Sequence, residues 1–536
     1  MKWINNDFQS IKELIESRKL NETYSEITNL DKAAEMISAN SKPIVIVGDY
    51  DVDGVMSSTI MYKALKRLGH KVRVRIPKRI AEGYGLSPKI IDECEEDDAL
   101  IITVDNGIAA VDAIAKAKDR GYTVIVTDHH QPQAVLPNAD LIVDPHLTKD
   151  EFPDFCGAGI ALMLAEKLLK EAAEDLYPYA FCATIADVVS LTGDNRRICR
   201  KGRSMKVPKA LEVLMEKMAV DPLHYSEEDL KFAINPAINA ASRILDDAEI
   251  PFKLFTTDSE EEMEKLAEQM IVANANRKEA ESKARERAEE YISKECLWGD
   301  CPLIINIPDC GLGTVGLVAG KLAEKYNVPT IVVTNNNGIL KGSCRVPNTI
   351  DNYNIKEELE KASDVLLSFG GHKMAAGLSL QEENLQILRE KMQKYIQIPE
   401  KVHYYDVTIT ADEVPQTIEE IEKYGPYGPD NDIPIVRVEG IRICPRYGKT
   451  HKLMGETIPT VKIFGNGISL IYFGVDVEKF DLINVSKLSV YGQLSFNWFM
   501  GGCEPQIILM DEPETIKIKK TTLAERLKAR AKGVKA

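Results

Sequence analysis

The sequence of 536 residues lacks the features of a membrane or secreted protein. No apolar run reaches the roughly 20 residues needed to cross a bilayer. The N-terminus lacks the charged-then-apolar order of a signal peptide. None of the ten cysteines belongs to a Cys-x-x-Cys pair, so no zinc site is expected. We therefore expect a cytoplasmic protein with free thiols and no membrane partner.

The chain also lacks a net positive charge, since its formal charge is −16. Its basic residues are nevertheless clustered in stretches almost free of acids, at 63–79, 196–209 and 516–536. Such clusters on an acidic chain predict a local phosphate-binding track, and the alternative is that each is only a solvated face. The last cluster is a basic tail that could dock DNA or a protein, or be disordered.

Internal repeats and low-complexity segments are absent as well. What remains is an ordinary globular composition, with 44% hydrophobic and 28% charged residues. A chain of this length exceeds a single core and predicts several domains.

Three short apolar runs, at 44–47, 101–104 and 124–127, read as buried strands that each end in polar side chains. The residues at these ends are Asp49, Asp51, Asp53, Asp105, Asp128, His129 and His130. Helix-length segments separate the runs, so the strands should be parallel with their carboxyl ends at one edge of a sheet. Clustered carboxylates repel unless cations neutralise them, which predicts a site for Mg²⁺ or Mn²⁺. One acidic run could be a solvated turn, but three coinciding strand ends argue against that.

A further acid, Asp187, lies in an apolar helix-like stretch at 183–189. An unpaired carboxylate there would be costly or neutral. The alternatives left open are that Asp187 caps a helix or pairs with Arg196 or Arg197.

The pattern predicts an α/β protein with a C-terminal β-rich region. We expect a helical cap at 1–40, a doubly wound parallel-sheet domain at 41–254, a long connecting helix at 255–297, a smaller α/β domain at 298–400, an OB-like barrel at 401–514 and the basic tail at 515–536.

These residues resemble the DHH phosphoesterase superfamily, and specifically the RecJ-type single-strand-specific exonucleases. The motifs that carry the resemblance are Gly48–Gly54, Val104–Ile108, Asp128–His130 and Ala186–Val189, with Glu82–Leu86, Ile238–Arg243, Gly370–His372, Ala375–Gly377, Tyr424–Pro429 and Gly492–Gln506 beside them. The resemblance runs from about residue 40 to 513 and departs from the family pattern at two places. Ser242 replaces a usual glycine, and Gly311-Leu312-Gly313 stands where a histidine is expected.

The resemblance implies two Mn²⁺ or Mg²⁺ ions held by Asp49, Asp51, Asp105, His129 and Asp187. It implies that Asp105 bridges the ions, that His130 contacts the scissile phosphate or aids proton transfer, and that Asp128 orients a neighbouring ligand. The substrate-binding residues would be Arg243, Ser343, Arg345, Gly370, Gly371 and His372. For Gly370-Gly371, a plain tight turn is the alternative.

The implied function is metal-dependent hydrolysis of single-stranded DNA from 5′ to 3′ in recombination and repair. Single-stranded DNA is the implied partner, and a single-strand-binding protein or a helicase could accompany it. One alternative is a DHH phosphodiesterase acting on short oligonucleotides or cyclic dinucleotides. Another is a non-catalytic replication scaffold on a decayed DHH fold.

Overall fold

The computed structural model describes residues 2–350, 352–393, 402–446, 448–455, 459–475, 480, 482, 485–499 and 502–517. The chain divides into a core unit, residues 22–400, and a terminal unit formed by residues 1–21 with 401–536. Among the described residues, no helix is both long enough and apolar enough to cross a membrane.

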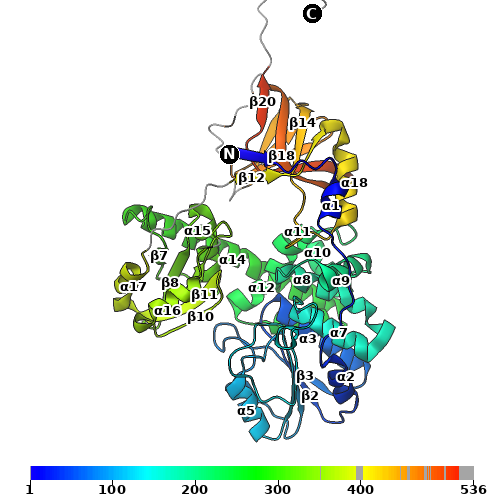
Figure 1. Cartoon of the computed structure of the whole chain (residues 1–536), viewed down its shortest axis with the longest axis vertical. Helices are drawn as coiled ribbons and strands as arrows, with labels where there is room; N and C mark the ends of the chain where they lie inside the picture. Colours follow the sequence, from blue (N-terminus) through cyan, green and yellow to red (C-terminus); the bar gives the residue numbers. More distant parts are fainter. Residues whose placement is uncertain are drawn as a thin grey trace, which may run out of the picture. The chain divides into compact units, whose positions relative to one another are not determined.

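A parallel five-stranded sheet forms the first half of the core unit, with strand order β3-β2-β4-β5-β6 (Figure 1). The strands are β2 (Ile44–Val47), β3 (Val72–Arg75), β4 (Leu100–Val104), β5 (Thr123–Thr127) and β6 (Leu141–Val143). Helices α3 (Val52–Arg67) and α7 (Gly157–Leu169) pack on one face, and α4 (Pro88–Asp92) and α5 (Val111–Asp119) pack on the other. This arrangement confirms the doubly wound α/β prediction, since central strands buried on both faces need helices on both sides.

Helices dominate the chain between this sheet and the long helix. Besides α7, they are α6 (Pro145–Thr148), η1 (Lys170–Leu176), α8 (Tyr177–Ala186), α9 (Gly193–Ser204), α10 (Lys209–Lys217), α11 (Glu227–Asp229), α12 (Asn235–Ala240) and α13 (Glu249–Thr256). A further helix, α2 (Leu30–Ser38), precedes the sheet. Two π-helical turns, η2 (Leu230–Ile234) and η3 (Ala241–Leu245), flank α12. π-helical turns are rare in proteins, and those that occur are often found at functional sites.

The predicted connecting helix is α14 (Glu260–Lys294), capped by the Ser259 side chain. Its first half buries Met263 and Met270 in the core of the first sheet and its helices, while Ala288 and Ile292 near its end join the core of a second sheet. One rigid element therefore carries both α/β parts of the core unit.

The second sheet has strand order β10-β11-β9-β8-β7. Its elements are β7 (Leu303–Asn306), β8 (Thr330–Asn336), β9 (Ile339–Arg345), β10 (Ser368–Gly371) and β11 (Ala375–Gln381), with α15 (Val315–Tyr326), α16 (Ile355–Lys361), η4 (Ser363–Val365), η5 (Glu382–Asn384) and α17 (Leu385–Met392). Strands β7 and β8 are parallel and the other pairs are antiparallel.

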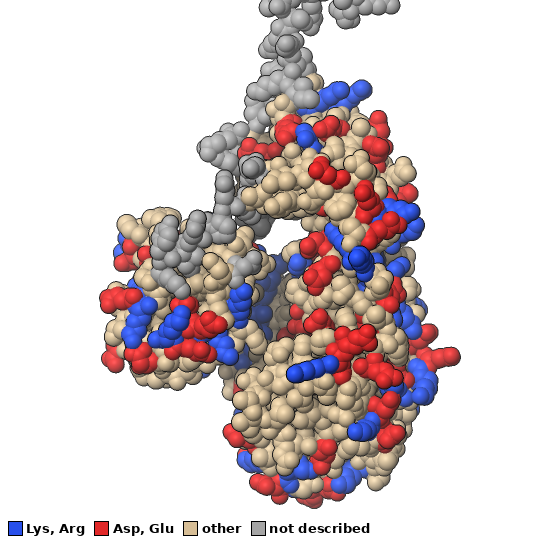
Figure 2. Space-filling view, viewed as in Figure 1, with Lys and Arg blue, Asp and Glu red and all other residues tan. Residues whose placement is uncertain are grey.

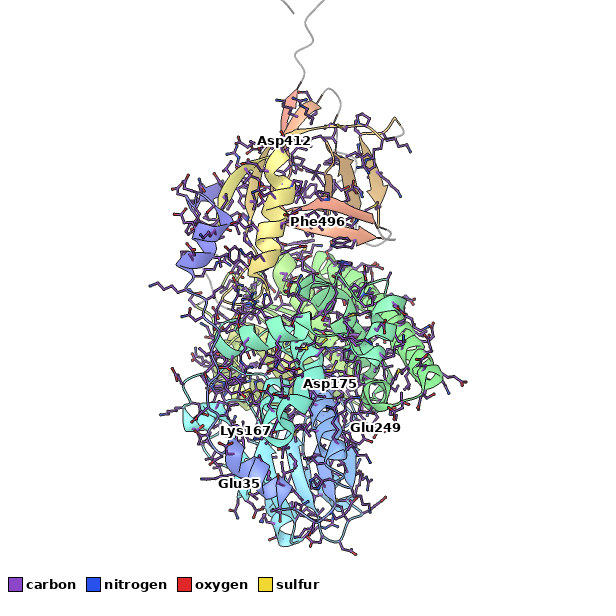
Figure 3. The ribbon with its side chains drawn as sticks, turned by 90° about the vertical axis from the view of Figure 1, so that its right-hand side faces the viewer. Glu35, Lys167, Asp175, Glu249, Asp412 and Phe496 are labelled. Carbon is purple, nitrogen blue, oxygen red and sulfur yellow. The ribbon has the colours of Figure 1, made fainter. Side chains whose placement is uncertain are left out.

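The terminal unit contains a larger, mostly antiparallel sheet with order β13-β14-β18-β19-β17-β16-β15, and β20 pairs with β18. The strands are β13 (Val407–Thr410), β14 (Val436–Arg442), β15 (His451–Met454), β16 (Thr460–Phe464), β17 (Ser469–Phe473), β18 (Val485–Phe499), β19 (Gly502–Leu509) and β20 (Glu514–Lys517). Figure 3 shows Phe496 on β18, and Asp412 in η6 (Ala411–Glu413), which leads into α18 (Val414–Tyr424). The β-rich C-terminal region is confirmed.

The N-terminal segment differs from the expected helical cap at 1–40. Strand β1 (Lys2–Asn5) pairs in parallel with β12 (Val402–Tyr405), and α1 (Ile11–Ser17) joins the hydrophobic core of the terminal unit. The rest of this segment, residues 22–40 with α2 and the buried Ile27, packs in the core unit. The expectation was wrong because an amphipathic pattern reveals an apolar face but not the core that will cover it. The expected basic tail begins within β20, and its residues 518–536 lie outside the described residues.

Candidate metal centre

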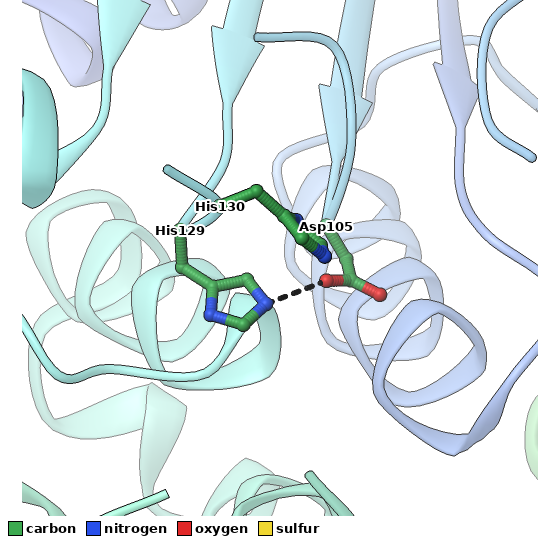
Figure 4. A group of neighbouring side chains, drawn as sticks. All are labelled: Asp105, His129 and His130. Atoms are coloured by element: carbon green, nitrogen blue, oxygen red, sulfur yellow. Dashed lines mark ion pairs between the residues drawn. The ribbon is translucent and has the colours of Figure 1, made fainter. Parts of the chain in front are cut away.

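The carboxyl ends of β2, β4 and β5 bring acidic and histidine side chains to one place. Three overlapping groups have potential ligand atoms within 4.8 Å of one another: Asp49, Asp51 and Asp105; Asp105, His129 and His130; Asp53, His129 and Asp187. Figure 4 shows the His129 ring directed at Asp105, where Nε2 lies 3.1 Å from Oδ1. All five side chains that the resemblance implies as metal ligands therefore belong to these three groups.

Local backbone geometry sets the position of Asp105, which, like His129, belongs to two of these groups. Asp105 has a φ of 62°, a left-handed conformation that is uncommon for a residue with a side chain. A β-carbon on Gly157, the first residue of α7, would lie 2.5 Å from Asp105 Cβ. Glycine at position 157 therefore allows the first turn of α7 to approach the carboxylate closely.

Asp187 lies at the C-terminal end of α8 rather than inside it. Its Oδ2 lies 3.8 Å from His129 Nε2, whereas Arg197, one of the partners considered from the sequence, pairs with Asp194 at 3.1 Å. Asp187 thus occupies the C-cap position of α8 and lies beside His129.

The electrostatics of the cluster fit a divalent cation. Burial, followed by repulsion from neighbouring carboxylates, raises the pKa of Asp49, Asp105 and Asp187 well above the usual range. The buried Oδ1 of Asp105 accepts no hydrogen bond within the described structure. A cation would neutralise this charge and use the unsatisfied oxygen, and several carboxylates with one imidazole suit Mn²⁺ or Mg²⁺.

Asp53 is a member of the site that the sequence assignment left out of its ligand set. Its carboxylate accepts hydrogen bonds from the backbone N–H groups of Gly157 (2.6 Å) and Ala158 (2.7 Å) at the start of α7. It also lies 3.7 Å from His129 Nε2. The alternation of Asp49, Asp51 and Asp53 was visible in the sequence, but only the fold shows that Asp53 anchors α7 beside the metal ligands.

His130 and Asp128 form a hydrogen-bonded pair next to the ligands, with 2.8 Å between Nδ1 and Oδ1. Asp128 also accepts bonds from the backbone N–H groups of His129 and Ile108, which fixes its orientation. Burial alone would lower the pKa of an imidazole, but the bond to Asp128 and nearby carboxylates outweigh it and raise the pKa of His130 to about 9. A protonated His130 at neutral pH is suited to binding or protonating an anionic group.

Tyr84 is a second residue absent from the assigned site, although its loop, Glu82–Leu86, is one of the motifs of the resemblance. Its hydroxyl donates to the carbonyl of Asp105 (2.7 Å) and lies 3.2 Å from His130 Nδ1. In the same loop, the backbone N–H of Gly85 donates to Asp49 (3.3 Å). The loop is thus bonded directly to the candidate ligands.

Arginine side chains gather beside the acidic cluster. Arg243 donates to the carbonyl of Gly313 (3.1 Å), and Arg345 donates to the Ser343 hydroxyl (2.8 Å). Burial, followed by the positive charge of Arg79, lowers the pKa of Arg243 to about 9, and Arg277 and Arg345 contribute in the same direction. Figure 2 shows Lys and Arg side chains on the wall of a recess within the core unit, beside the part that carries α15–α17. The fold therefore groups the predicted Arg243, Ser343 and Arg345 and adds two arginines.

Among the described hydrogen bonds and ion pairs, none joins Gly370, Gly371 or His372 to this cluster. Gly371 has a φ of 142°, and a β-carbon there would lie 2.4 Å from the Ala375 carbonyl, so the tight-turn alternative accounts for it. Gly370 pairs with Gly377, which pairs with Ser343, so two strand spacings, about 10 Å, separate Gly370 from Ser343.

The basic clusters of the sequence differ in what their side chains contact. Many charges of the 196–209 cluster pair with acids, as in Arg200–Glu22, Lys201–Glu174 and Arg203–Glu227. In the 63–79 cluster, Arg79 does reach the site, stacking over the Tyr50 ring at 4.6 Å. Most of the 196–209 cluster is therefore ion-paired surface and not a continuous phosphate-binding track.

The chain matches three family models in succession. These are the DHH family N-terminal domain over residues 43–191, the DHHA1 domain over residues 303–398 and the RecJ OB domain over residues 405–511. Together with the strand-end acids, they define a DHH-type protein with an added OB domain.

The curated relatives narrow this class. The single-stranded-DNA-specific exonuclease RecJ of Salmonella typhimurium is 33% identical over 421 residues, covering 72% of each chain. RecJ of Bacillus subtilis is 32% identical over 502 residues, which is 90% of this chain but only 62% of that relative. The crystal structure of RecJ in complex with Mn²⁺ from Thermus thermophilus superposes with a TM-score of 0.73 at 26% identity, covering 92% of this chain and 72% of that one. The chain belongs to the RecJ family.

Proposed function

We propose that this protein is a metal-dependent exonuclease that hydrolyses phosphodiester bonds of single-stranded DNA from the 5′ end. The observation that carries the proposal is the buried Asp105 carboxylate, with an unsatisfied Oδ1 held 3.1 Å from His129 Nε2. A relative crystallised with Mn²⁺ and relatives named as single-stranded-DNA-specific exonucleases support the same activity.

Asp49, Asp51, Asp105, His129 and Asp187 would hold two Mn²⁺ or Mg²⁺ ions, and Asp53 is close enough to join them. When bound, the ions supply an activated water and charge stabilisation for an in-line phosphoryl displacement. The residues of the chain keep the ligand oxygens oriented, because α7 and the strand ends hold them in fixed geometry.

His130 would contact the reacting phosphate, because Asp128 keeps its imidazole protonated and directed. Its proton could stabilise charge on a phosphate oxygen or pass to the leaving oxygen. Asp128 would act as an orienting residue, since its carboxylate is committed to the His130 ring and to three backbone N–H groups, those of Ile108, His129 and His130.

Arg243, Ser343 and Arg345 would bind a substrate phosphate, with Arg79 as a further cation. Arginine binds phosphate through paired N–H groups, and buried arginines already repelling one another gain when an anion joins them. Exposed aromatic side chains of the terminal unit, such as Phe473 (53% exposed), offer stacking surfaces for bases. Gly370, Gly371 and His372 have weaker support, because they lie away from this cluster.

A single-strand-binding protein or a helicase is a candidate protein partner on the basis of the proposed substrate alone. The cytoplasm is the proposed compartment, supported by ten cysteines that are all free thiols.

The test compares wild type with Asp105→Asn, using Asp112→Asn on the exposed start of α5 as the matched control. The substrates are 5′- and 3′-labelled single strands, the corresponding duplex, dinucleotides and cyclic dinucleotides, each with and without Mn²⁺. We expect Asp105→Asn to lower the single-strand rate by about a thousandfold or more, because a lost ligand removes several kcal/mol of charge stabilisation. Faster cleavage of dinucleotides than of long strands would favour the alternative DHH phosphodiesterase. Activity that survives in Asp105→Asn would refute the site.

A further inference from the structure

One carboxylate connects the arginine cluster to the loop beside the metal ligands. Asp246 directly follows η3, the π-helical turn that carries Arg243. Its Oδ1 accepts a hydrogen bond from the backbone N–H of Ile80 (2.6 Å), and its Oδ2 accepts one from Ala81 (3.1 Å). Asp246 has a φ of 53°, so the backbone turns sharply at the residue whose side chain makes these bonds. Both oxygens therefore bind one turn of the 78–86 loop.

The other end of the 78–86 loop is bonded to the metal centre. The Tyr84 hydroxyl donates to the Asp105 carbonyl, the Gly85 N–H donates to the Asp49 carboxylate, and the Leu86 N–H donates to the Asn106 side chain. The loop is also held within itself and to β3, because the nearly buried Glu82 accepts bonds from Arg75 and from the backbone N–H of Lys78. The loop is thus fixed to the ligands independently of Asp246.

The arginine side of the connection is held tightly as well. Arg243 donates to the Gly313 carbonyl, and a β-carbon on Gly313 would lie 2.1 Å from the Arg243 carbonyl oxygen. Arg243 also lies close enough to other arginines to feel their charge, so mutual repulsion favours their separation when no anion is bound. A fixed attachment is needed to keep this side chain at one distance from the metal ligands.

We propose that Asp246 is a positioning residue that sets the distance between the phosphate bound by Arg243 and the phosphodiester at the metal centre. The inference rests on the proposed function and deepens it. The described hydrogen bonds of the Asp246 carboxylate go to Ile80 and Ala81 and not to the candidate ligands. It acts through η3 on one side and through the 78–86 loop on the other. Without it, a strand still binds, but its scissile bond no longer lies in line with the reacting groups.

The experiment compares Asp246→Ala and Asp246→Asn with wild type in the full chain with Mn²⁺. Asp247→Ala is the matched control, because Asp247 is the next residue and its carboxylate bonds only to the N–H of Glu249 among the described hydrogen bonds. Two substrates are used: a long 5′-phosphorylated single strand, which needs both sites, and bis(para-nitrophenyl) phosphate, a small diester that needs only the metal centre.

We expect Asp246→Ala to lower kcat on the long strand by about 10- to 100-fold with less than about a threefold change in KM, as a misplaced reacting bond should. Hydrolysis of the small diester should change by less than about twofold, because the bonds of Tyr84, Gly85 and Leu86 still hold the loop against the metal centre. Asp246→Asn keeps one acceptor oxygen and should lie between Asp246→Ala and wild type. Asp247→Ala should match wild type on both substrates.

Equal losses on both substrates would overturn the proposal, because they would indicate general damage to the metal centre. A rise in KM with unchanged kcat would also overturn it, because it would indicate lost affinity rather than lost alignment. If Asp246→Ala cleaves the long strand as fast as wild type, the positioning role is wrong while the proposed function stands. If wild type leaves the strand intact, the proposed function itself fails.

Discussion

Gly157 offers a sharp test of whether Asp105 sits where the chemistry requires it. An alanine at this position would place its β-carbon 2.5 Å from Asp105 Cβ and 2.8 Å from Asp105 Oδ1. Non-bonded carbon atoms prefer separations of about 3.5–4.0 Å. Asp105 or the start of α7 must therefore move by about 1 Å in Gly157→Ala.

A shift of that size is large for a metal ligand. Coordination distances tolerate roughly 0.2 Å, and misplacing a reacting group by about 1 Å can lower a rate about a hundredfold. Overpacking itself typically lowers the free energy of unfolding by about 1–3 kcal/mol. We expect Gly157→Ala to lose about 100-fold in exonuclease rate and to bind Mn²⁺ more weakly, while the protein stays folded.

The assay pairs strand hydrolysis with Mn²⁺ titration calorimetry and thermal unfolding, and Gly159→Ala serves as the control. Gly159 lies in the same turn of α7, but a β-carbon there would first meet a ring carbon of Phe155 at 3.2 Å. Gly159→Ala should lower the free energy of unfolding slightly and leave the affinity for Mn²⁺ unchanged. If both variants bind Mn²⁺ and cleave DNA equally well, Asp105 is not the ligand that the geometry indicates.

Three further predictions follow from burial and charge. In the metal-free protein, His130 should titrate near pH 9, and Asp128→Asn should return its pKa toward about 6.5. The free energy of unfolding that this pair contributes is fully present below about pH 6.5 and is lost as pH rises through about 9. If NMR shows the same His130 pKa in Asp128→Asn as in wild type, the pairing is contradicted. The raised pKa values of the buried acids predict that metal-free stability falls as pH rises above about 4, because the unfolded acids lose their protons first. Mn²⁺ should therefore raise the unfolding temperature more at pH 8 than at pH 5, and an equal increase would contradict this cause. The Trp3 ring stacks on Tyr491 at 4.4 Å, and its indole N–H donates to Asp511. We therefore expect Trp3→Ala to lower the unfolding temperature of the terminal unit by about 5 °C in calorimetry, more than the control Ile4→Ala does. Equal effects would argue against this anchoring of the N-terminus.

Much of the metal centre was predictable from local patterns. A buried strand such as Ile44–Val47 is recognisable from its apolar, β-branched residues, and the acids that follow it are adjacent in sequence. Parallel strands then require their carboxyl ends to share one edge, which is enough to group Asp49, Asp105 and His129 without knowledge of the fold. The position of Asp187 was harder to predict, because no comparable rule states where the end of a helix lies relative to the edge of a sheet.

The sequence alone thus determined the class of sheet, the edge that carries the acids and the family resemblance. Only the tertiary structure decided that Asp53 anchors α7, that Asp246 holds the 78–86 loop and that β1 joins β12. The physical reason is that side-chain periodicity and strand ends are local properties. Contacts between residues more than a hundred positions apart depend instead on how whole elements pack, which no local pattern records.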